Sequence, residues 1–265
     1  MGDIATIDPR FVPIRFSTLK SMATSPLHYR HACQSQFEET LSMRLGTGTH
    51  ALTFGTPKVV VFKARRAGKV WDAFKEEHAN DVILSEKEFA IASAMTKSLT
   101  TDIDADPLLF APGTQHELDV RWTFMGRACR GRLDALSPTA VVDIKGVKDA
   151  NPRWFPTQAA RMAWHAQVTW YADGVEAAGL GWRHPHLVAV ENSAPFAVTV
   201  WRLSERAILQ GRQLYRSWFE RVLECEAKGE WPGYSSGVLE FDVPNFLRTA
   251  PIAVDELSSD EEAMP

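Results

Sequence analysis

The spacing of apolar residues changes along the chain, and each change indicates a different kind of secondary structure. Helical spacing dominates the first hundred residues, and apolar and polar residues alternate in the middle, as on strands with one buried face. The elements that this pattern predicts are helices starting at 18 and 26 and over 70–98, a strand at 59–62, strands at 116–124, 127–136 and 140–144, a helix over 152–178, strands at 187–191 and 196–203, and a helix over 205–228.

Polar residues at the expected helix ends support several of these boundaries. A serine before the first helical residue accepts a hydrogen bond from a free backbone N–H, and the expected N-caps of this kind are Ser17, Ser25 and Ser204. Ser85 and Glu88 have the spacing of a capping box. Gly229 is expected to end the last helix, because glycine readily adopts the left-handed conformation there.

The order of the predicted elements indicates the α/β (α+β) class. Strands that meet in hairpins, with a long helix between the third and fourth, favour a central mixed β-sheet flanked by helices. We expect one domain over residues 1–250, with a helical N-terminal portion over about 1–110 and a sheet-containing core over about 111–230. Residues 251–265 carry five acidic residues and no Lys or Arg, so we expect a disordered acidic tail.

The charge distribution changes the first impression that the composition gives. A formal charge of −4 argues against a protein that binds nucleic acid through an overall positive field. However, the acidic tail accounts for the sign, and residues 1–250 carry a net charge of +1. We expect the tail to stay clear of nucleic acid or to contact a basic partner.

The composition excludes several classes of protein. A hydrophobic fraction of 45% and a charged fraction of 23% are those of a globular protein. No run approaches the ~18 apolar residues of a membrane span, and the start has no secretion signal, so we expect a cytoplasmic protein. Cys33, Cys129 and Cys225 are too few and too widely spaced for a four-cysteine metal or iron–sulfur site.

Two carboxylates on neighbouring predicted strands are the main candidates for chemistry. Asp143 follows Val141 and Val142 in an apolar strand, and Asp134 lies on the strand before it. A buried carboxylate requires a cation, a hydrogen-bonding partner or a metal. Lys145 shares the face of Asp143, because residues two apart on a strand point the same way. A lone Asp-x-Lys at a strand end is also commonly a surface salt bridge, so the motif alone leaves that interpretation open.

Other polar residues strengthen the candidate site. Gln167 and Tyr171 are four residues apart on the long predicted helix and therefore share one face. Glu117 lies on the first alternating strand, and His50 follows a Gly-Thr-Gly-Thr stretch. Each of these residues alone is compatible with a structural role. Two carboxylates beside a lysine suit Mg²⁺, which takes oxygen ligands, and Lys145 would then position or deprotonate the attacking water.

Basic residues surround this region of the sequence. Residues 119–165 carry a net charge of +4, and Arg130 and Arg132 share a predicted strand face with Asp134. The candidates for contacts to nucleic-acid phosphates are Arg127, Arg130, Arg132, Arg153 and Arg161. A second basic cluster, in a predicted loop, is either another contact or a solvated surface; it comprises Lys58, Lys63, Arg65, Arg66 and Lys69. Base stacking by Trp154, Trp164 or Trp170 is the alternative to core packing.

Taken together and in this order, the candidate residues resemble the PD-(D/E)XK nuclease superfamily. The positions that carry the resemblance are His50, Glu117, Asp134, Asp143-Ile144-Lys145, and Gln167 with Tyr171. The chain looks most similar to the RecE-type (exonuclease VIII-like) and RecB-type branch, which adds the upstream His and the Gln-x-x-x-Tyr helix. Ser-Thr-Leu-Lys, Ser-Pro-Leu-His-Tyr, Gly-Thr-Gly-Thr-His, Ile-Leu-Ser-Glu-Lys-Glu and Gly-Glu-Trp-Pro-Gly-Tyr extend the similarity over residues 17–235.

The resemblance implies a restriction-endonuclease-like core and a role for each matched residue. His50, Asp134, Asp143 and the backbone carbonyl of Ile144 would bind Mg²⁺, with Mn²⁺ as a substitute. Lys145 would orient or activate the water, Glu117 would support the waters of the metal or a second ion, and Gln167 and Tyr171 would hold Lys145 or the scissile phosphate. Two positions depart from the pattern within the range of this branch: Leu133 replaces the proline, and Asp143 stands where many relatives have Glu.

The resemblance also implies a biological role. Relatives of this type are phage and prophage recombination exonucleases that act on ends of linear double-stranded DNA, 5′→3′, in the cytoplasm of a bacterial host. They leave a 3′ single strand for an annealing protein (RecT-like or Redβ-like) and form ring-shaped homo-oligomers, trimers or tetramers. Two alternatives stay open from the sequence: a structure-specific endonuclease of the same fold, and a catalytically silent DNA-binding protein in which Asp143 and Lys145 form only an ion pair.

Overall fold

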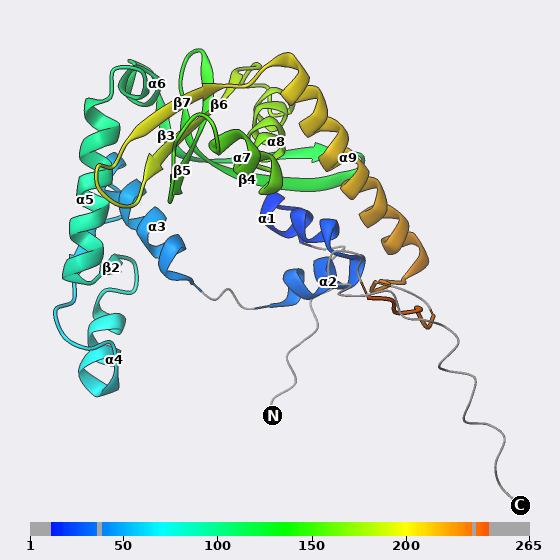
Figure 1. Cartoon of the computed structure of the whole chain (residues 1–265), viewed down its shortest axis with the longest axis horizontal. Coiled ribbons are helices and arrows are strands. Elements are labelled where there is room, and N and C mark those ends of the chain that lie inside the picture. The colour runs from blue at the N-terminus through cyan, green and yellow to red at the C-terminus, as the bar shows by residue number, and fades with distance from the viewer. Residues whose placement is uncertain (1–11, 36–38, 235–236, 244–265) are drawn as a thin grey trace, which may run out of the picture.

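A five-stranded mixed sheet forms the centre of the computed structural model, which describes residues 12–35, 39–234 and 237–243 (Figure 1). Its order is β3 (Gln115–Phe124), β4 (Arg127–Leu136), β5 (Ala140–Val147), β6 (His184–Glu191) and β7 (Val198–Arg202). Strands β5 and β6 run parallel, and the other neighbours run antiparallel. The predicted mixed sheet is therefore confirmed; the acidic tail lies outside the described residues.

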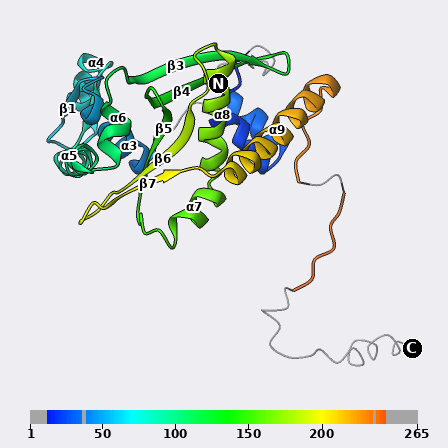
Figure 2. The ribbon, with the colours of Figure 1, turned by 90° about the horizontal axis from the view of Figure 1, so that it is seen from above.

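Helices cover both faces of this sheet (Figures 1 and 2). They are α1 (Phe16–Leu19), α2 (Pro26–Gln34), α3 (Leu41–Phe54), α4 (Gly68–Glu77), α5 (Glu86–Thr101), α6 (Ala105–Phe110), α7 (Phe155–Arg161), α8 (Trp164–Ala177) and α9 (Glu205–Lys228), with a 3₁₀ turn, η2 (Lys20–Ala23), after α1. Within the described ranges, no helix combines the length and the apolar character needed to cross a membrane.

The two faces of the sheet bury separate cores. Helix α8 packs on one face and is itself covered by α9, and α1 and α2 lie beside α9 (Figure 2). Gly211 permits this packing, because a Cβ there would come within 3.0 Å of the Cα of Ala166 on α8. Helices α3, α5 and α6 contact the other face, where Met95 and Leu99 of α5 meet Val188 of β6. The site described below lies between these two layers.

Several predicted helix ends are confirmed. Ser25 and Ser204 accept hydrogen bonds from the first turns of α2 and α9, and Gly229 ends α9 with a φ of 70°. Ser85 and Glu88 form the predicted capping box. The N-cap prediction for Ser17 is wrong, because α1 already begins at Phe16 and Ser17 lies inside it.

Two predicted long helices are each interrupted. The helix over 70–98 is split by β2 (Val82–Leu84), which pairs in parallel with β1 (Val59–Val61). The local spacing of Val82-Ile83-Leu84 predicts a helical face, and only the pairing with β1, more than twenty residues earlier, makes this run a strand. The helix over 152–178 is split into α7 and α8 at Ala163, whose φ of 55° does not belong to a right-handed helix.

A buried ion cluster connects the unit formed by β1, α4 and β2 to helices α3 and α5. The side chain of Glu88 is 8% exposed and accepts hydrogen bonds from Arg44 (3.0 Å), Arg66 (2.6 Å) and the backbone N–H of Ser85 (2.7 Å). Burial raises the pKa of Glu88, but the hydrogen bonds from Ser85 and Arg66 and the charge of Arg66 outweigh it and lower that pKa from 4.5 to about 2. The ionised carboxylate therefore stabilises the fold.

We predict that Glu88→Gln lowers the free energy of unfolding at pH 7 by about 1–3 kcal/mol, because buried donors lose a charged acceptor. The folded pKa lies below the unfolded one, so the contribution is complete above pH 4.5 and is lost as the pH falls towards 2. Urea denaturation at pH 7 and pH 3 measures this difference between variant and parent. Glu86→Gln, at an exposed position in the same turn, is the control and should cost less than about 0.5 kcal/mol. A difference that does not shrink at pH 3 would contradict the prediction.

Candidate active site

Strands β4 and β5 separate at the two predicted carboxylates. They pair through Ala135 with Val142 and Leu136 with Val141, and beyond these pairs β5 continues along β6 while β4 continues along β3. Asp134 and Asp143 are the next residues of the two strands. Oδ2 of Asp134 accepts a hydrogen bond of 2.6 Å from the backbone N–H of Ile144. A side chain thus replaces the backbone partner at the fork between the strands.

The residue opposite Asp134 has an unusual backbone. Glu117 occupies that place on β3 and has a φ of 50°, in the left-handed region that costs a non-glycine residue about 1–2 kcal/mol. On β4, Leu133 belongs to the core under α8, whereas Ala135 belongs to the core on the opposite face. Residues two apart on a regular strand share a face. The strand therefore changes face at Asp134, between the two cores.

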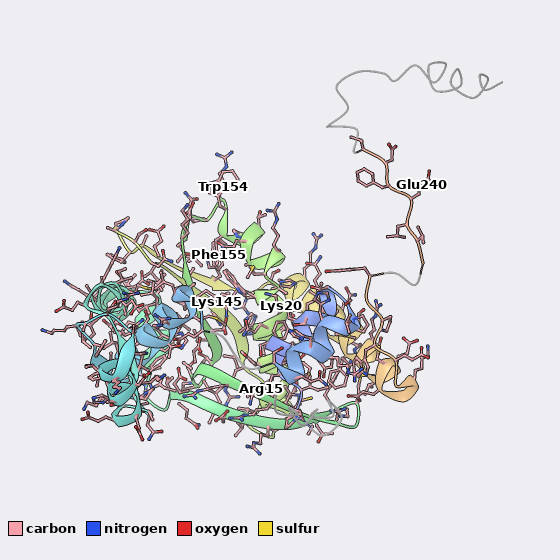
Figure 3. The ribbon with its side chains drawn as sticks, turned by 90° about the horizontal axis from the view of Figure 1, so that it is seen from below. Arg15, Lys20, Lys145, Trp154, Phe155 and Glu240 are labelled. Atoms are coloured by element: carbon pink, nitrogen blue, oxygen red, sulfur yellow. The ribbon has the colours of Figure 1, made fainter. Side chains whose placement is uncertain are left out.

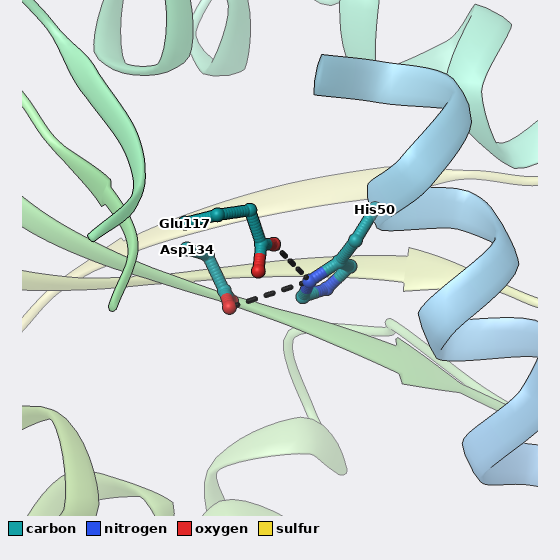
Figure 4. Close-up of side chains that lie close together, drawn as sticks. All are labelled: His50, Glu117 and Asp134. Carbon is teal, nitrogen blue, oxygen red and sulfur yellow. Dashed lines mark hydrogen bonds and ion pairs between the residues drawn. The ribbon is translucent and has the colours of Figure 1, made fainter. Parts of the chain in front are cut away.

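Helix α3 brings His50 to these two carboxylates (Figure 4). Its Nδ1 lies 3.2 Å from Oε1 of Glu117 and 3.3 Å from Oδ1 of Asp134. Ligand atoms of the three residues lie within 4.8 Å of one another. Gly48, two residues before His50, allows α3 to pack closely on β2, since a Cβ there would lie 2.7 Å from the side chain of Leu84.

The electrostatics of this cluster call for a cation. Burial raises the pKa of Asp134 to about 6, and the charge of Asp143 adds to that effect against the opposing charge of His50. Burial lowers the pKa of His50, but the charges of Asp134 and Glu117 outweigh it and raise that pKa. Burial raises the pKa of Glu117, but His50 and Arg132 lower it overall. A half-buried set of carboxylate oxygens and one imidazole nitrogen fits a divalent cation such as Mg²⁺ or Mn²⁺.

On the α8 side of the fork, polar groups form a chain from Asp143 to Tyr171. Asp143 is buried, with 3% of its surface exposed, and its Oδ2 lies 2.5 Å from Nζ of Lys145. The same Nζ donates a hydrogen bond of 3.0 Å to Oε1 of Gln167. Nε2 of Gln167 donates to the hydroxyl of Tyr171 at 3.0 Å. The predicted face shared by Gln167 and Tyr171 is confirmed. Their amide and hydroxyl groups hold the ammonium group of Lys145 in place.

A glycine on β4 makes room for the tyrosine. A Cβ on Gly131 would lie 2.8 Å from ring atoms of Tyr171. The ring therefore lies against bare backbone at the edge of the fork. Burial raises the pKa of the Tyr171 phenol above its ordinary range, and the charge of Asp143 adds to this, so the hydroxyl stays neutral and serves as a hydrogen-bond partner.

The structure places the five predicted phosphate-binding arginines differently. Arg130 and Arg132 lie on β4 next to the fork and pair with Asp119 (2.9 Å) and Glu117 (2.6 Å). Arg127 forms an ion pair with Glu226 of α9. Arg153 lies over the ring of Trp154 in the loop before α7, and Arg161 lies in the last turn of α7. Among the described contacts, the last three do not touch the carboxylates at the fork.

Among the tryptophans and the second basic cluster, Trp170 and Arg66 have structural contacts. The exposed members are Trp154, Lys58, Lys63, Arg65 and Lys69. Trp170 is buried in the core, as expected for packing. The ring of Trp164 is tilted against that of Phe155 and lies 5.7 Å from Nζ of Lys145. Trp154 is exposed and projects from the molecule (Figure 3). In the second cluster, Arg66 is bound to Glu88, and Lys69 lies in α4.

Two cations near the site were not predicted from the sequence. The backbone of Ile14 pairs with Ala128 and Arg130, along the edge of β4 that β5 has left. The next residue, Arg15, therefore lines a cleft of about 280 Å³ with Ser17, Arg130, Arg132 and Tyr171, among others. Lys20 lies near Lys145 (Figure 3); burial, and then the charge of Lys145, lower the pKa of Lys20. Within the described chain, neither Arg15 nor Lys20 has a carboxylate partner.

No local pattern distinguishes these two positions. Arg15 and Lys20 lie on either side of the Ser-Thr-Leu stretch, whose sequence predicts a helix start and carries part of the family resemblance. Their place at the site depends on the pairing of Ile14 with β4, which is distant in sequence. The sequence offers one indication, which is that two basic residues lie five positions apart around the first predicted helix.

The fold and this arrangement of side chains define the class. The chain matches the family model of a PDDEXK-like domain of unknown function (DUF3799) over residues 15–241, and it belongs to that family. No match was found among curated proteins. The restriction-endonuclease-like core inferred from the resemblance is thereby confirmed, and family and fold together support a nuclease.

One solved structure shares the fold. The chain is similar to a crystal structure of a "putative exonuclease" from Eubacterium rectale, with a TM-score of 0.64 and 12% identity over 94% of this chain and 93% of that chain. A second match, to the SSO0001 protein, has a TM-score of 0.27 and 13% identity over 68% of this chain and 88% of that chain, and is too distant to bear on the fold.

We predict that Glu117→Gln weakens the binding of Mn²⁺ by roughly 10- to 100-fold, the range for residues that orient a metal ligand. Glutamine keeps the size of the side chain but removes the charge that faces His50 and Arg132. Isothermal titration calorimetry with Mn²⁺ measures the effect. Asp119→Asn, two residues along the same strand, is the matched control and should leave the affinity unchanged. Equal affinities for Glu117→Gln and the parent would show that Glu117 does not support the metal site.

Proposed function

We propose that this chain is a Mg²⁺-dependent exodeoxyribonuclease that degrades one strand of linear double-stranded DNA from an end, 5′→3′. The observation that carries the proposal is the fork of β4 and β5, where Asp134, Asp143 and Lys145 converge. One buried and one half-buried carboxylate beside a positioned ammonium group suit the hydrolysis of a phosphodiester in the presence of a divalent cation.

The residues at the fork divide the work of hydrolysis. His50, Asp134, Asp143 and the carbonyl of Ile144 would hold the cation, with Glu117 supporting it. Binding of the cation supplies Lewis-acid stabilisation of the charge that develops on the phosphoryl oxygens. Lys145, held between Asp143 and Gln167, orients the attacking water and neutralises charge at the phosphate. Tyr171 fixes the amide of Gln167 and thereby the position of Lys145.

The cations around the fork suit the phosphate backbone of DNA. Arg15 and Lys20 lack carboxylate partners among the described residues, so an incoming phosphate would be their first counter-ion. Arg130 and Arg132 are each already paired with a carboxylate and would therefore contribute less uncompensated positive charge. Contacts of this kind position the duplex without reading its sequence, as a non-specific nuclease requires.

The remaining parts of the proposal rest on the likeness to RecE-type nucleases. They are the 5′→3′ polarity, the 3′ overhang passed to a single-strand annealing protein (RecT-like or Redβ-like), the ring-shaped homo-oligomer, and action in the cytoplasm of a bacterial host. A structure-specific endonuclease of the same fold is the second candidate, because the chemistry at the fork would be the same. A silent DNA-binding protein is the third.

We predict Mg²⁺-dependent loss of linear duplex DNA and no nicking of closed circular duplex. Purified protein is incubated with each substrate in Mg²⁺, in Mn²⁺ and in EDTA. Asp143→Ala and Lys145→Ala should each abolish cleavage, because one removes a cation ligand and the other the group that positions the water. Circular dichroism shows whether the variants are folded, and Lys97→Ala on the exposed side of α5 is the control that should stay active.

Each outcome of this assay separates the candidates. Nicking of the circular substrate would favour the endonuclease, and no digestion of either substrate would leave the silent DNA-binding protein. Activity that survives in folded Asp143→Ala or Lys145→Ala would refute the site. Duplexes labelled at the 5′ or the 3′ end show the polarity, since 5′→3′ digestion releases the 5′ label first.

We predict that Arg15→Ala and Lys20→Ala weaken the binding of duplex DNA in EDTA, where cleavage does not occur. Each lost phosphate contact should make the slope of log K against log salt shallower by about 0.9. Fluorescence anisotropy at several salt concentrations measures the slope. Lys97→Ala removes a lysine far from the fork and should not change it. An unchanged slope for both Arg15→Ala and Lys20→Ala would place the DNA elsewhere.

A further inference from the structure

A short apolar segment follows α9 and is exposed to solvent. Val238 is 103% exposed, Leu239 is 73% exposed and Phe241 is 85% exposed. Leu239 and Phe241 are two residues apart, so in an extended chain they share one side, and Glu240 lies on the other. The label on Glu240 in Figure 3 lies well away from the body of the molecule. Large apolar side chains gathered in this way mark a contact with another surface.

An apolar groove lies at the other end of α9. It has a volume of about 330 Å³ and is lined by Phe155 and Ala160 of α7, Trp201 and Leu203 at the end of β7, Ala207 of α9, and others. The rings of Phe155 and Trp201 stack at 5.3 Å and form one wall. Arg202 is the charged residue of the lining. The groove thus combines an aromatic wall with one cation at its rim.

The segment and the groove are complementary in shape and charge. An aromatic ring such as that of Phe241 suits a slot walled by two stacked rings. Residues 237–243 contain two acidic residues, Glu240 and Asp242, and no Lys or Arg, whereas the groove carries Arg202. We propose that residues 238–241 of one copy of this chain dock into the Phe155–Trp201 groove of a second copy, with Glu240 beside Arg202.

The segment is too short to reach the groove of its own molecule, which favours docking into the groove of a second copy. Tyr234 is held next to α2, with its ring 5.3 Å from that of His28, and α2 lies beside the C-terminal end of α9 (Figure 1). From Tyr234 to Phe241 an extended chain spans at most about 25 Å. Ala207 in the groove lies about 32 Å of helix away from Lys228 at that end. The segment therefore falls short of its own groove.

The contact differs in kind from a two-fold dimer. The segment and the groove are different surfaces, so every copy offers one of each, and the contact passes from copy to copy until it closes into a ring. A segment of four residues buries too little surface for a stable interface by itself. It acts as the anchoring contact of a larger interface, where a buried aromatic side chain contributes most. The inference rests on the ring-shaped homo-oligomer of the proposed function and names a contact within it, and it does not depend on nuclease activity.

The test is the mass of the full chain in solution, without DNA or metal, by sedimentation equilibrium over a range of concentrations. The parent should associate, and Phe241→Asp and Ala160→Glu should each raise the dissociation constant on the order of 30-fold, as loss of a hot-spot contact does. Ala160 is exposed, so the added carboxylate faces Glu240 without disturbing the core. Ile103→Asp, at an apolar position that is also 85% exposed, is the matched control and should associate like the parent.

A mixing experiment tests the direction of the contact. Phe241→Asp keeps an intact groove and Ala160→Glu keeps an intact segment, so their mixture should form a one-to-one complex that neither variant forms alone. In a second pair, Arg202→Glu should weaken association, and adding Glu240→Arg should restore it. A monomeric parent, association that both single variants leave unchanged, or the absence of a mixed complex would each overturn the proposal. The last result would leave the groove to a partner of another kind.

Discussion

The hydrogen bond from the backbone N–H of Ile144 to the carboxylate of Asp134 is the interaction on which the rest of the site depends. A backbone N–H inside a sheet costs free energy if it has no partner. Because Asp134 supplies that partner, β5 turns away from β4 at the position where Asp143 begins the free part of the strand. The same bond therefore opens the fork and fixes the spacing of the two carboxylates.

The fork exposes a pair of carboxylates on one face and an Asp–Lys ion pair on the other. Distant parts of the chain supply polar partners to both. Helix α3 delivers His50 to the face where Asp134 and Glu117 lie. Helix α8 delivers Gln167 and Tyr171 to the face where Asp143 and Lys145 lie. The N-terminal helical portion is thus part of the site. Without α3 one carboxylate cluster would have no imidazole, and without α8 the ammonium of Lys145 would have no fixed direction.

The sequence predicted those features that depend on neighbours along the chain. The alternation of β3, β4 and β5, the capping box at Ser85, and the shared face of Gln167 and Tyr171 all follow from local spacing. The resemblance to known nucleases supplied the grouping of His50 with Asp134. The failures involve partners far away in sequence or backbone conformations that composition does not encode. Strand β2 is a strand because β1 pairs with it, and the left-handed residues Glu117 and Ala163 carry no glycine signal.

The pairing of Ile14 with the open edge of β4 has a consequence for how the molecule reaches this state. The contact between Ile14 and β4 cannot form until the β3–β4 hairpin exists. That hairpin consists of residues about a hundred positions later in the chain. Contacts between such distant segments form slowly, because a long loop has to close first. During this interval β4 presents a bare edge on which another chain can add. The segment that places Arg15 at the site therefore also covers part of the edge of β4 that β5 has left.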